Sequence, residues 1–171
     1  MSKKIACVIT DMFEDVEYTD PAKAFKDDGH EIVTIEKEAG KQVTGKQGEA
    51  KVTIDKSIDD VNPADFDALL IPGGFSPDQL RADERFVTFS KHFMEEKKPV
   101  LAICHGPQLL ITAKALEGRL ATGFKSIQVD MEYAGADLKD EEVVVCQNQL
   151  VTSRQPDDIP AFNRESLKVL A

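Results

Sequence analysis

Basic residues are the minority charge in this 171-residue chain. Twenty-one lysines and arginines stand against 31 aspartates and glutamates, which gives a formal net charge of −10. Binding to a phosphate backbone draws on clustered lysine and arginine, so the composition argues against nucleic acids as partners. Long hydrophobic runs are also missing, and no stretch approaches the roughly 20 apolar residues of a membrane helix. We therefore expect a protein that binds neither nucleic acids nor membranes.

Cysteine and histidine are equally scarce, with three of each. The cysteines, at positions 7, 104 and 146, are too scattered for a disulfide framework, which favours the reducing cytoplasm and a chemical role for any special cysteine. The spacing of cysteine and histidine fits no metal site, and no glycine-rich phosphate loop occurs, so we expect neither metal nor cofactor. No histidine follows His105, which argues against a glutamine amidotransferase, because that enzyme needs a base from later in the chain.

Apolar runs of strand length alternate with helical patterns along the whole chain. Strands that are apolar throughout are typical of a parallel sheet covered by helices on both faces. We therefore predict an α/β fold, a three-layer flavodoxin-like sandwich with a mostly parallel central sheet, in a single domain spanning residues 1–171. The main strands are expected over residues 5–10, 31–35, 67–71 and 100–103, with hairpins at 43–54 and 143–153. The main helices are expected from Thr19 or Asp20, from Ser76 through Met94, over 127–134 and over 157–170.

The centre of this arrangement is the turn at Cys104. The buried strand over 100–103 breaks at Cys104-His105-Gly106, and a helical pattern follows at once. A nucleophile at such a sharp strand-to-helix turn is typical of a nucleophile elbow. The helix dipole favours the thiolate there. A cysteine is most often a small buried hydrophobe, but its placement at this turn favours a role for Cys104 as the nucleophile.

Two other loops are expected at the same edge of the sheet. In parallel α/β sheets ligands bind beyond the carboxyl ends of the strands, so the loops after Thr10 and Ile71 should converge on Cys104. The first loop carries Glu14, a candidate proton carrier or simply a solvated acid. The second carries Gly73 and Gly74, whose backbone N–H groups, together with that of His105, could form an oxyanion hole that binds substrate.

The remaining candidates are His105 and Asp78. Any base must be His105 or a carboxylate, yet adjacent residues on a turn normally diverge, which makes His105 an awkward partner for Cys104. Asp78 follows Pro77 and fits a first-turn acid stabilised by the helix dipole.

With these residues in place, the chain resembles the ThiJ/PfpI superfamily, and within it the PfpI-type intracellular protease/deglycase branch. The resemblance runs from Lys4 to Leu170. Its markers are Phe13–Glu17, Thr44-Gly-Lys46 with Gly48, Phe66–Gly74, Ala102–Gln108, Ala134-Gly-Ala136, Val143–Val145 and Val151–Arg154 with Pro156-Asp157.

The resemblance implies roles by position. The nucleophile falls on Cys104 and its neighbouring histidine on His105, the carboxylate that contacts the cysteine falls on Glu14, and backbone donors fall on Gly74 and His105. An acid from a neighbouring subunit, matching Asp78 where many relatives have glutamate, completes the site in related oligomers. The resemblance also implies homodimers, with homohexamers in some members.

Activity is implied only as a set of alternatives. Relatives act as deglycases on methylglyoxal or glyoxal adducts, as cofactor-free glyoxalases or as ATP-independent peptidases. These activities share the attack of a thiolate on a carbonyl carbon. The leading expectation is a stress-protection hydrolase or lyase acting on small aldehydes or on glycated proteins and peptides. A cysteine peptidase, or a redox-sensing or chaperone-like protein without turnover, remains open.

Overall fold

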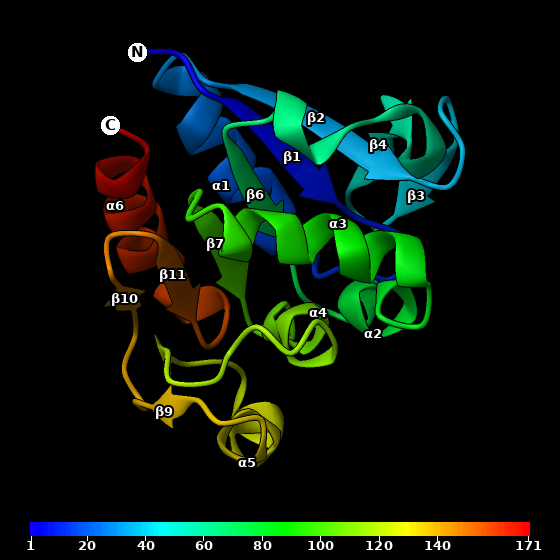
Figure 1. Cartoon of the computed structure of the whole chain (residues 1–171). Helices are drawn as coiled ribbons and strands as arrows, with labels where there is room; N and C mark the ends of the chain where they lie inside the picture. Colours follow the sequence, from blue (N-terminus) through cyan, green and yellow to red (C-terminus); the bar gives the residue numbers. More distant parts are fainter.

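A seven-stranded sheet forms the centre of the computed structural model, which describes residues 1–171 (Figure 1). The strands lie in the order β10-β11-β7-β6-β1-β2-β5, and every neighbouring pair is parallel except β10 with β11. The mostly parallel sheet is thus confirmed. Its strands are β1 (Lys4–Val8), β2 (Glu31–Glu36), β5 (Lys56–Ser57), β6 (Ala68–Ile71), β7 (Val100–Ile103), β10 (Val144–Cys146) and β11 (Leu150–Ser153).

Two small strand pairs and six α-helices complete the fold. The pairs are β3 (Gln42–Thr44) with β4 (Lys51–Thr53), which is antiparallel, and β8 (Leu120–Ala121) with β9 (Asp137–Leu138), which is parallel. The helices are α1 (Asp15–Asp27), α2 (Ser76–Leu80), α3 (Glu84–Glu95), α4 (Pro107–Thr112), α5 (Gln128–Tyr133) and α6 (Ile159–Leu170). Short 3₁₀ turns lie at Ile58–Asp60, Pro63–Asp65, Lys125–Ile127 and Pro156–Asp158. None of the helices has the length and apolar character needed to cross a membrane.

Alternate residues of each strand enter two separate hydrophobic cores. Successive strand side chains point to opposite faces, so in β1 Ile5 and Cys7 pack on one side while Ala6 and Val8 pack on the other. The first core includes residues of α1 and α6, and the second includes residues of α3 and α4. In Figure 1 α3 crosses one face of the sheet. The expected three-layer sandwich is therefore confirmed.

The first helix begins earlier than the sequence pattern predicted. The start was predicted at Thr19 or Asp20, which would place Pro21 in the first turn, but α1 starts at Asp15 and contains Pro21 in its interior. The Asp15 carboxylate explains the early start, because it accepts backbone N–H groups from the loop between β3 and β4 and ties the first turn to that loop. Residues 15–17 are consequently helical rather than part of the loop after Thr10, and this decides how the carboxylates of Glu14 and Glu17 point.

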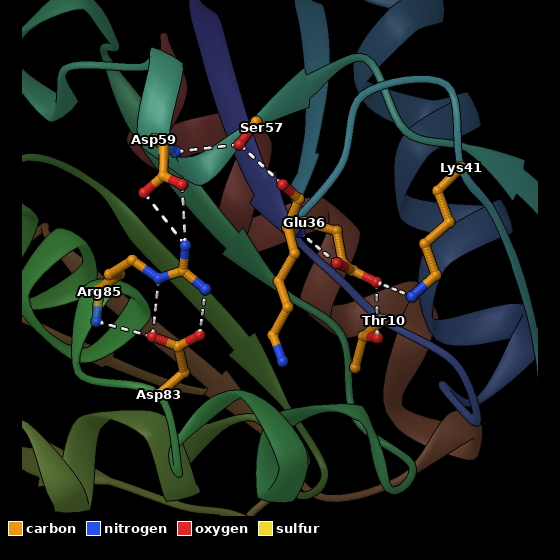
Figure 2. A network of polar contacts seen from close by, with 8 residues as sticks. Thr10, Glu36, Lys41, Ser57, Asp59, Asp83 and Arg85 are labelled. Atoms are coloured by element: carbon orange, nitrogen blue, oxygen red, sulfur yellow. Dashed lines mark hydrogen bonds and ion pairs between the residues drawn. The ribbon is translucent and has the colours of Figure 1, made fainter.

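The expected helix from Ser76 through Met94 is two helices. The chain leaves α2 at Leu80 and re-enters a helix at Glu84, after Asp83 adopts an extended backbone. The Asp83 carboxylate caps α3 by accepting the N–H of Arg85 at 3.1 Å. The Arg85 guanidinium also bonds the carboxylates of Asp83 and Asp59, as Figure 2 shows. This charged cluster stabilises the break between the two helices.

A buried carboxylate lies at the end of β2. The Glu36 side chain is 2% exposed, and one of its oxygens accepts from Lys41 Nζ at 2.6 Å and from Thr10 Oγ1 at 3.2 Å (Figure 2). Its other oxygen accepts the backbone N–H of Lys37. Burial on its own would raise the pKa of Glu36, but the Lys41 ammonium and these hydrogen bonds outweigh burial and hold the pKa below its usual value.

We expect Glu36→Gln to lower the free energy of unfolding by about 2 kcal/mol at pH 7, because a charge-assisted buried bond is lost. The folded pKa of Glu36 lies below its unfolded value near 4.3, so its contribution is present above that pH and is lost as the pH falls through the folded pKa. The variant should therefore lose less stability than wild type as the pH falls below the unfolded value near 4.3. Urea unfolding at several pH values measures this, with exposed Glu38→Gln as control. Equal pH slopes for the two variants would contradict the expectation.

Candidate active site

Cys104 lies at the turn between β7 and α4 in a backbone conformation that side chains rarely adopt. Its φ is +64°, in the left-handed region. The turn is held on both sides, because the Cys104 N–H donates to Ser153 O at 2.9 Å and its carbonyl accepts from Phe124 N at 2.8 Å. A Cβ added to Gly106 would lie 2.5 Å from Ile71 O, so only glycine fits there. This geometry agrees with the elbow expected from the sequence.

The carboxyl beside the thiol belongs to Glu17. Glu17 is fully buried, its Oε1 accepts the Gly73 N–H at 3.0 Å, and its Oε2 has no hydrogen-bond partner. A Cβ on Gly73 would meet both Glu17 Oε1 and Cys104 Cβ, which places this carboxyl beside the thiol. Burial, reinforced by the negative charge of Glu14, raises the pKa of Glu17 to about 8, although the neighbouring Cys104 thiol and the Gly73 N–H act to lower it. Glu17 therefore holds a proton at neutral pH, close to the sulfur.

Glu14 does not have the expected contact with the cysteine. Its carboxylate pairs with Lys46 Nζ at 2.9 Å and accepts Gln47 Nε2 at 3.2 Å, on the loop between β3 and β4. Because α1 begins at Asp15, Glu14 occupies the cap position, whereas Glu17 lies in the first turn with its side chain buried beside the glycine turn. The expectation for Glu14 is thus corrected to Glu17, one helical turn later.

His105 turns back toward its neighbour, contrary to the expectation that the two side chains diverge. His105 Nδ1 lies 3.3 Å from Cys104 Sγ, and its Nε2 lies 3.3 Å from Ser126 Oγ. The ring stacks on Phe124 with the centroids 4.9 Å apart. Burial, and to a lesser degree the charge of Lys46, lowers the pKa of His105, so the imidazole is neutral at pH 7. A neutral imidazole at this distance is suited to accept the thiol proton.

The glycine turn after β6 divides its two N–H groups between different partners. The N–H of Gly74 and the N–H of His105 act to lower the pKa of Cys104, which makes them the donors available to an anion there. The N–H of Gly73 is occupied by Glu17, so it is not available to substrate. A Cβ on Gly73 would lie 2.5 Å from Glu17 Oε1 and 2.8 Å from Cys104 Cβ, which leaves room for glycine alone. Gly73 therefore shapes the site, and Gly74 carries the donor.

The thiol itself is not activated by its position alone. Burial raises the pKa of Cys104, as does the Glu17 carboxylate once it is ionised, and the N–H groups of Gly74 and His105 offset this only in part. The sequence-based expectation that the helix terminus would favour the thiolate is therefore outweighed by burial. Attack by the sulfur requires that its proton be removed as the substrate arrives.

Asp78 lies apart from this group in the single chain. Its side chain is 65% exposed, and its nearest charged partner is Arg81 at 3.9 Å. No hydrogen bond or ion pair joins Asp78 to His105 of the same chain, although its charge acts to raise the pKa of His105.

Three side chains near the thiol received no role from the sequence. Glu17 lay within a recognised marker segment, but only the register of α1 directs it to the thiol. Ser126, beside His105, has no sequence signal at all. Lys46 belongs to the Thr44-Gly-Lys46 marker, and the structure places it on Glu14 and over the ring of Phe75.

Known proteins resemble this chain over nearly its whole length. It is 75% identical to "General stress protein 18" of Bacillus subtilis and 64% identical to "Protein/nucleic acid deglycase 2" of Escherichia coli. It is 62% identical to "Putative cysteine protease YraA" of Bacillus subtilis. Each similarity extends over 170 residues and covers 99% of both chains.

Solved structures share the fold of this chain. A ThiJ/PfpI domain protein from Brachyspira murdochii superposes with a TM-score of 0.90 at 28% identity, covering 98% of this chain and 95% of that one. A two-domain protein from Anabaena variabilis, with DJ-1/ThiJ/PfpI-like and ferritin-like domains, gives 0.94 at 39% identity, covering 98% of this chain and 48% of that one. The model of the DJ-1/PfpI family matches residues 3–169. With its fold, its cysteine elbow and its relatives in agreement, this chain belongs to the DJ-1/PfpI family.

Proposed function

We propose that this protein is a cysteine-dependent stress-protection enzyme of the deglycase or glyoxalase type, acting in the cytoplasm on methylglyoxal and glyoxal or their adducts. One observation carries the proposal: Cys104 Sγ lies 3.3 Å from a neutral imidazole, and a buried carboxyl whose pKa is about 8 lies beside it across Gly73. The names of the stress protein and deglycase relatives support the same class of activity.

The geometry supports a covalent route. As the carbonyl carbon approaches, His105 Nδ1 takes the thiol proton and the sulfur of Cys104 attacks. The developing oxyanion is stabilised by the N–H groups of Gly74 and His105, which also act to lower the pKa of Cys104. Glu17, which starts protonated, gives its proton to that oxyanion. The carboxylate so formed takes the proton from the former aldehyde carbon and delivers it to the neighbouring carbon of the bound 2-oxoaldehyde.

The overall reaction balances without an external oxidant. Within one molecule the aldehyde carbon is oxidised to a thioester while the neighbouring ketone carbon is reduced to an alcohol. Water then cleaves the bond between carbon and sulfur, releasing a 2-hydroxycarboxylate, a proton and the free thiol of Cys104. If the substrate is an adduct, the thiol or amine that carried the aldehyde leaves when Cys104 displaces it.

Substrates and assembly follow from the same family membership. We propose small aldehydes and glycated protein or peptide side chains as substrates. The deglycase relative's name also includes nucleic acids. In this chain the net charge of −10 disfavours binding to long phosphate backbones. We also propose a homodimer or homohexamer in which Asp78 of the partner subunit approaches His105.

The test is lactate release from methylglyoxal-treated N-acetylcysteine. We expect release well above the rate in buffer, and a rate that exceeds the one measured with free methylglyoxal at the concentration in equilibrium with the adduct. Equal rates in these two arms would identify a glyoxalase that consumes only the free aldehyde. No lactate above buffer in either arm would contradict the proposal.

A peptidase is the second candidate, favoured by the name of the 62% identical cysteine protease relative. The same thiol and imidazole suit attack on a peptide carbonyl. Hydrolysis of short fluorogenic peptides by wild type, abolished in Cys104→Ala, together with no lactate release, would replace the leading proposal with this one.

A further inference from the structure

The loop that carries Lys46 is built to hold its shape. Residues 45–50 connect β3 and β4, and the carboxylate of Asp15, 2% exposed, accepts the N–H groups of Gln47, Glu49 and Ala50 at 2.8, 3.0 and 2.7 Å. The same carboxylate leaves no room beside Gly45, where an added Cβ would lie 2.3 Å from its carbon. The Asp15 carboxylate thus acts as a positioning group, and the loop presents Lys46 at one place.

That place is against the glycine turn of the active site. Lys46 N donates to Phe13 O at 2.8 Å, and its Nζ lies 5.5 Å from the centre of the Phe75 ring. Phe75 follows the turn Gly73-Gly74, and a Cβ on Gly73 would lie 2.8 Å from Cys104 Cβ. On the other side of the turn, Glu14 N donates to Gly73 O at 3.2 Å, and the Glu14 carboxylate binds Lys46 Nζ. Lys46 is therefore fixed to both flanks of the turn.

The positive charge of Lys46 is only partly neutralised by its neighbours, so it can attract an anion. Glu14 is the only ion-pair partner of Lys46, through Oε2, and Glu14 Oε1 accepts a hydrogen bond from Gln47 Nε2. The Lys46 side chain is 32% exposed, so an ion in solution can approach it. The charge of Lys46 acts to lower the pKa of Glu17 and the pKa of His105, and the Cys104 thiolate acts to raise the pKa of Lys46. The nearby Arg81, by contrast, is directed at Thr112 and Asp78.

We propose that Lys46 determines specificity by attracting carbonyl substrates that carry a carboxylate to Cys104. An anion approaching the sulfur gains the attraction of the ammonium, while a neutral compound of the same size gains nothing. The apolar ring of Phe75, 56% exposed, offers the carbon skeleton a surface beside that ammonium. The assignment of a substrate class rests on the proposed function. The preference of the Cys104 thiol for anionic reagents does not depend on that function.

The charge preference is measured by alkylating Cys104 with iodoacetate and with iodoacetamide, which differ in charge but deliver similar groups. The ratio of the two rates, followed by mass spectrometry of the peptide that contains Cys104, cancels changes in thiolate content. We expect Lys46→Gln to lower the iodoacetate-to-iodoacetamide ratio about threefold and Lys46→Arg to restore it. Lys51→Gln, an exposed lysine on the neighbouring strand β4, is the matched control and should keep the wild-type ratio.

Two further arms separate charge from structure. Glu14→Gln removes the competing carboxylate, so the ratio should rise, and about 0.5 M NaCl should shrink every difference between variants. An unchanged ratio in both Lys46→Gln and Glu14→Gln would overturn the inference, as would an equal fall in Lys51→Gln.

Turnover provides the link to substrate class. For methylglyoxal adducts, Lys46→Gln should raise KM about threefold with N-acetylcysteine, which carries a carboxylate, and leave KM unchanged with neutral N-acetylcysteamine. Equal changes for the two adducts would overturn the substrate assignment. If wild type turns over neither adduct, the proposed function fails, while the alkylation ratio still decides whether Lys46 selects anions.

Discussion

Cys104→Ala protein is expected to release lactate from methylglyoxal-treated N-acetylcysteine at no more than about one thousandth of the wild-type rate. The sulfur forms the covalent bond to the carbonyl carbon, and no other side chain at the elbow supplies a comparable nucleophile. The backbone should keep its shape, because alanine at φ +64° meets the same constraint as cysteine and the bonds to Ser153 and Phe124 use only backbone atoms. Lactate production measured against unfolding midpoints separates chemistry from folding.

Cys7→Ala is the matched control for that experiment. Cys7 is a fully buried thiol in β1 that packs in the core shared with α1 and α6. Its loss should cost about 1 kcal/mol of stability through the small cavity it leaves, with turnover preserved. If Cys104→Ala retains a tenth or more of the wild-type activity, the reaction does not pass through this thiol, and the proposed mechanism is wrong.

Glu17→Gln is expected to reduce turnover about 100-fold, against no more than a severalfold loss for Glu14→Gln. The amide keeps the bond from the Gly73 N–H, so the geometry survives while the exchangeable carboxyl proton is lost. Glu14 contacts Lys46 and Gln47 rather than the sulfur, so its neutralisation acts only through charge. Side-by-side kcat values for the two variants decide which carboxyl moves the proton, and a larger loss in Glu14→Gln would reverse the assignment.

The same substitution has a consequence for stability. The folded pKa of Glu17, about 8, lies above its unfolded value near 4.3, so wild type loses stability as the pH rises through this range. Glutamine has no proton to lose and should remove that dependence. Glu17→Gln protein should therefore be more stable than wild type at pH 8 and above. Urea unfolding at pH 5 and pH 9 measures the difference, and a less stable variant at pH 9 would show that the buried charge is compensated.

Predictions of the sheet and its cores succeeded because they depend on local patterns. A run such as Val100–Ile103 is apolar at every position, which suits only a strand covered on both faces, and alternate residues then enter the two cores. The elbow was also readable, since a strand, Cys104 and a glycine two residues later occur together in the chain. The boundaries of α1 were wrong because Pro21, a good first-turn residue, is tolerated in the interior of a helix whose start Asp15 secures by distant contacts.

The candidate site shows where local pattern stops being informative. Glu14 and Glu17 differ by three residues in one acidic segment, and nothing in their neighbours distinguishes a solvated carboxyl from a buried one. The choice depends on the register of α1, and that register depends on a loop more than 30 residues later in the chain. The approach of His105 to Cys104 likewise follows from the positive φ at Cys104 and from stacking on Phe124, which arrives from beyond α4.

The sequence by itself determined that this chain is a parallel α/β protein with a cysteine at an elbow, because apolar periodicity and the small residues at a tight turn act over only a few positions. Only the tertiary structure decided which groups surround that thiol. Glu17, Ser126 and Lys46 come from separate elements, and their meeting reflects contacts between distant parts of the chain. Burial then sets the protonation of the groups around the thiol. It raises the pKa of Glu17 and of Cys104, so that both hold a proton at neutral pH, and it lowers the pKa of His105, so that the imidazole is neutral.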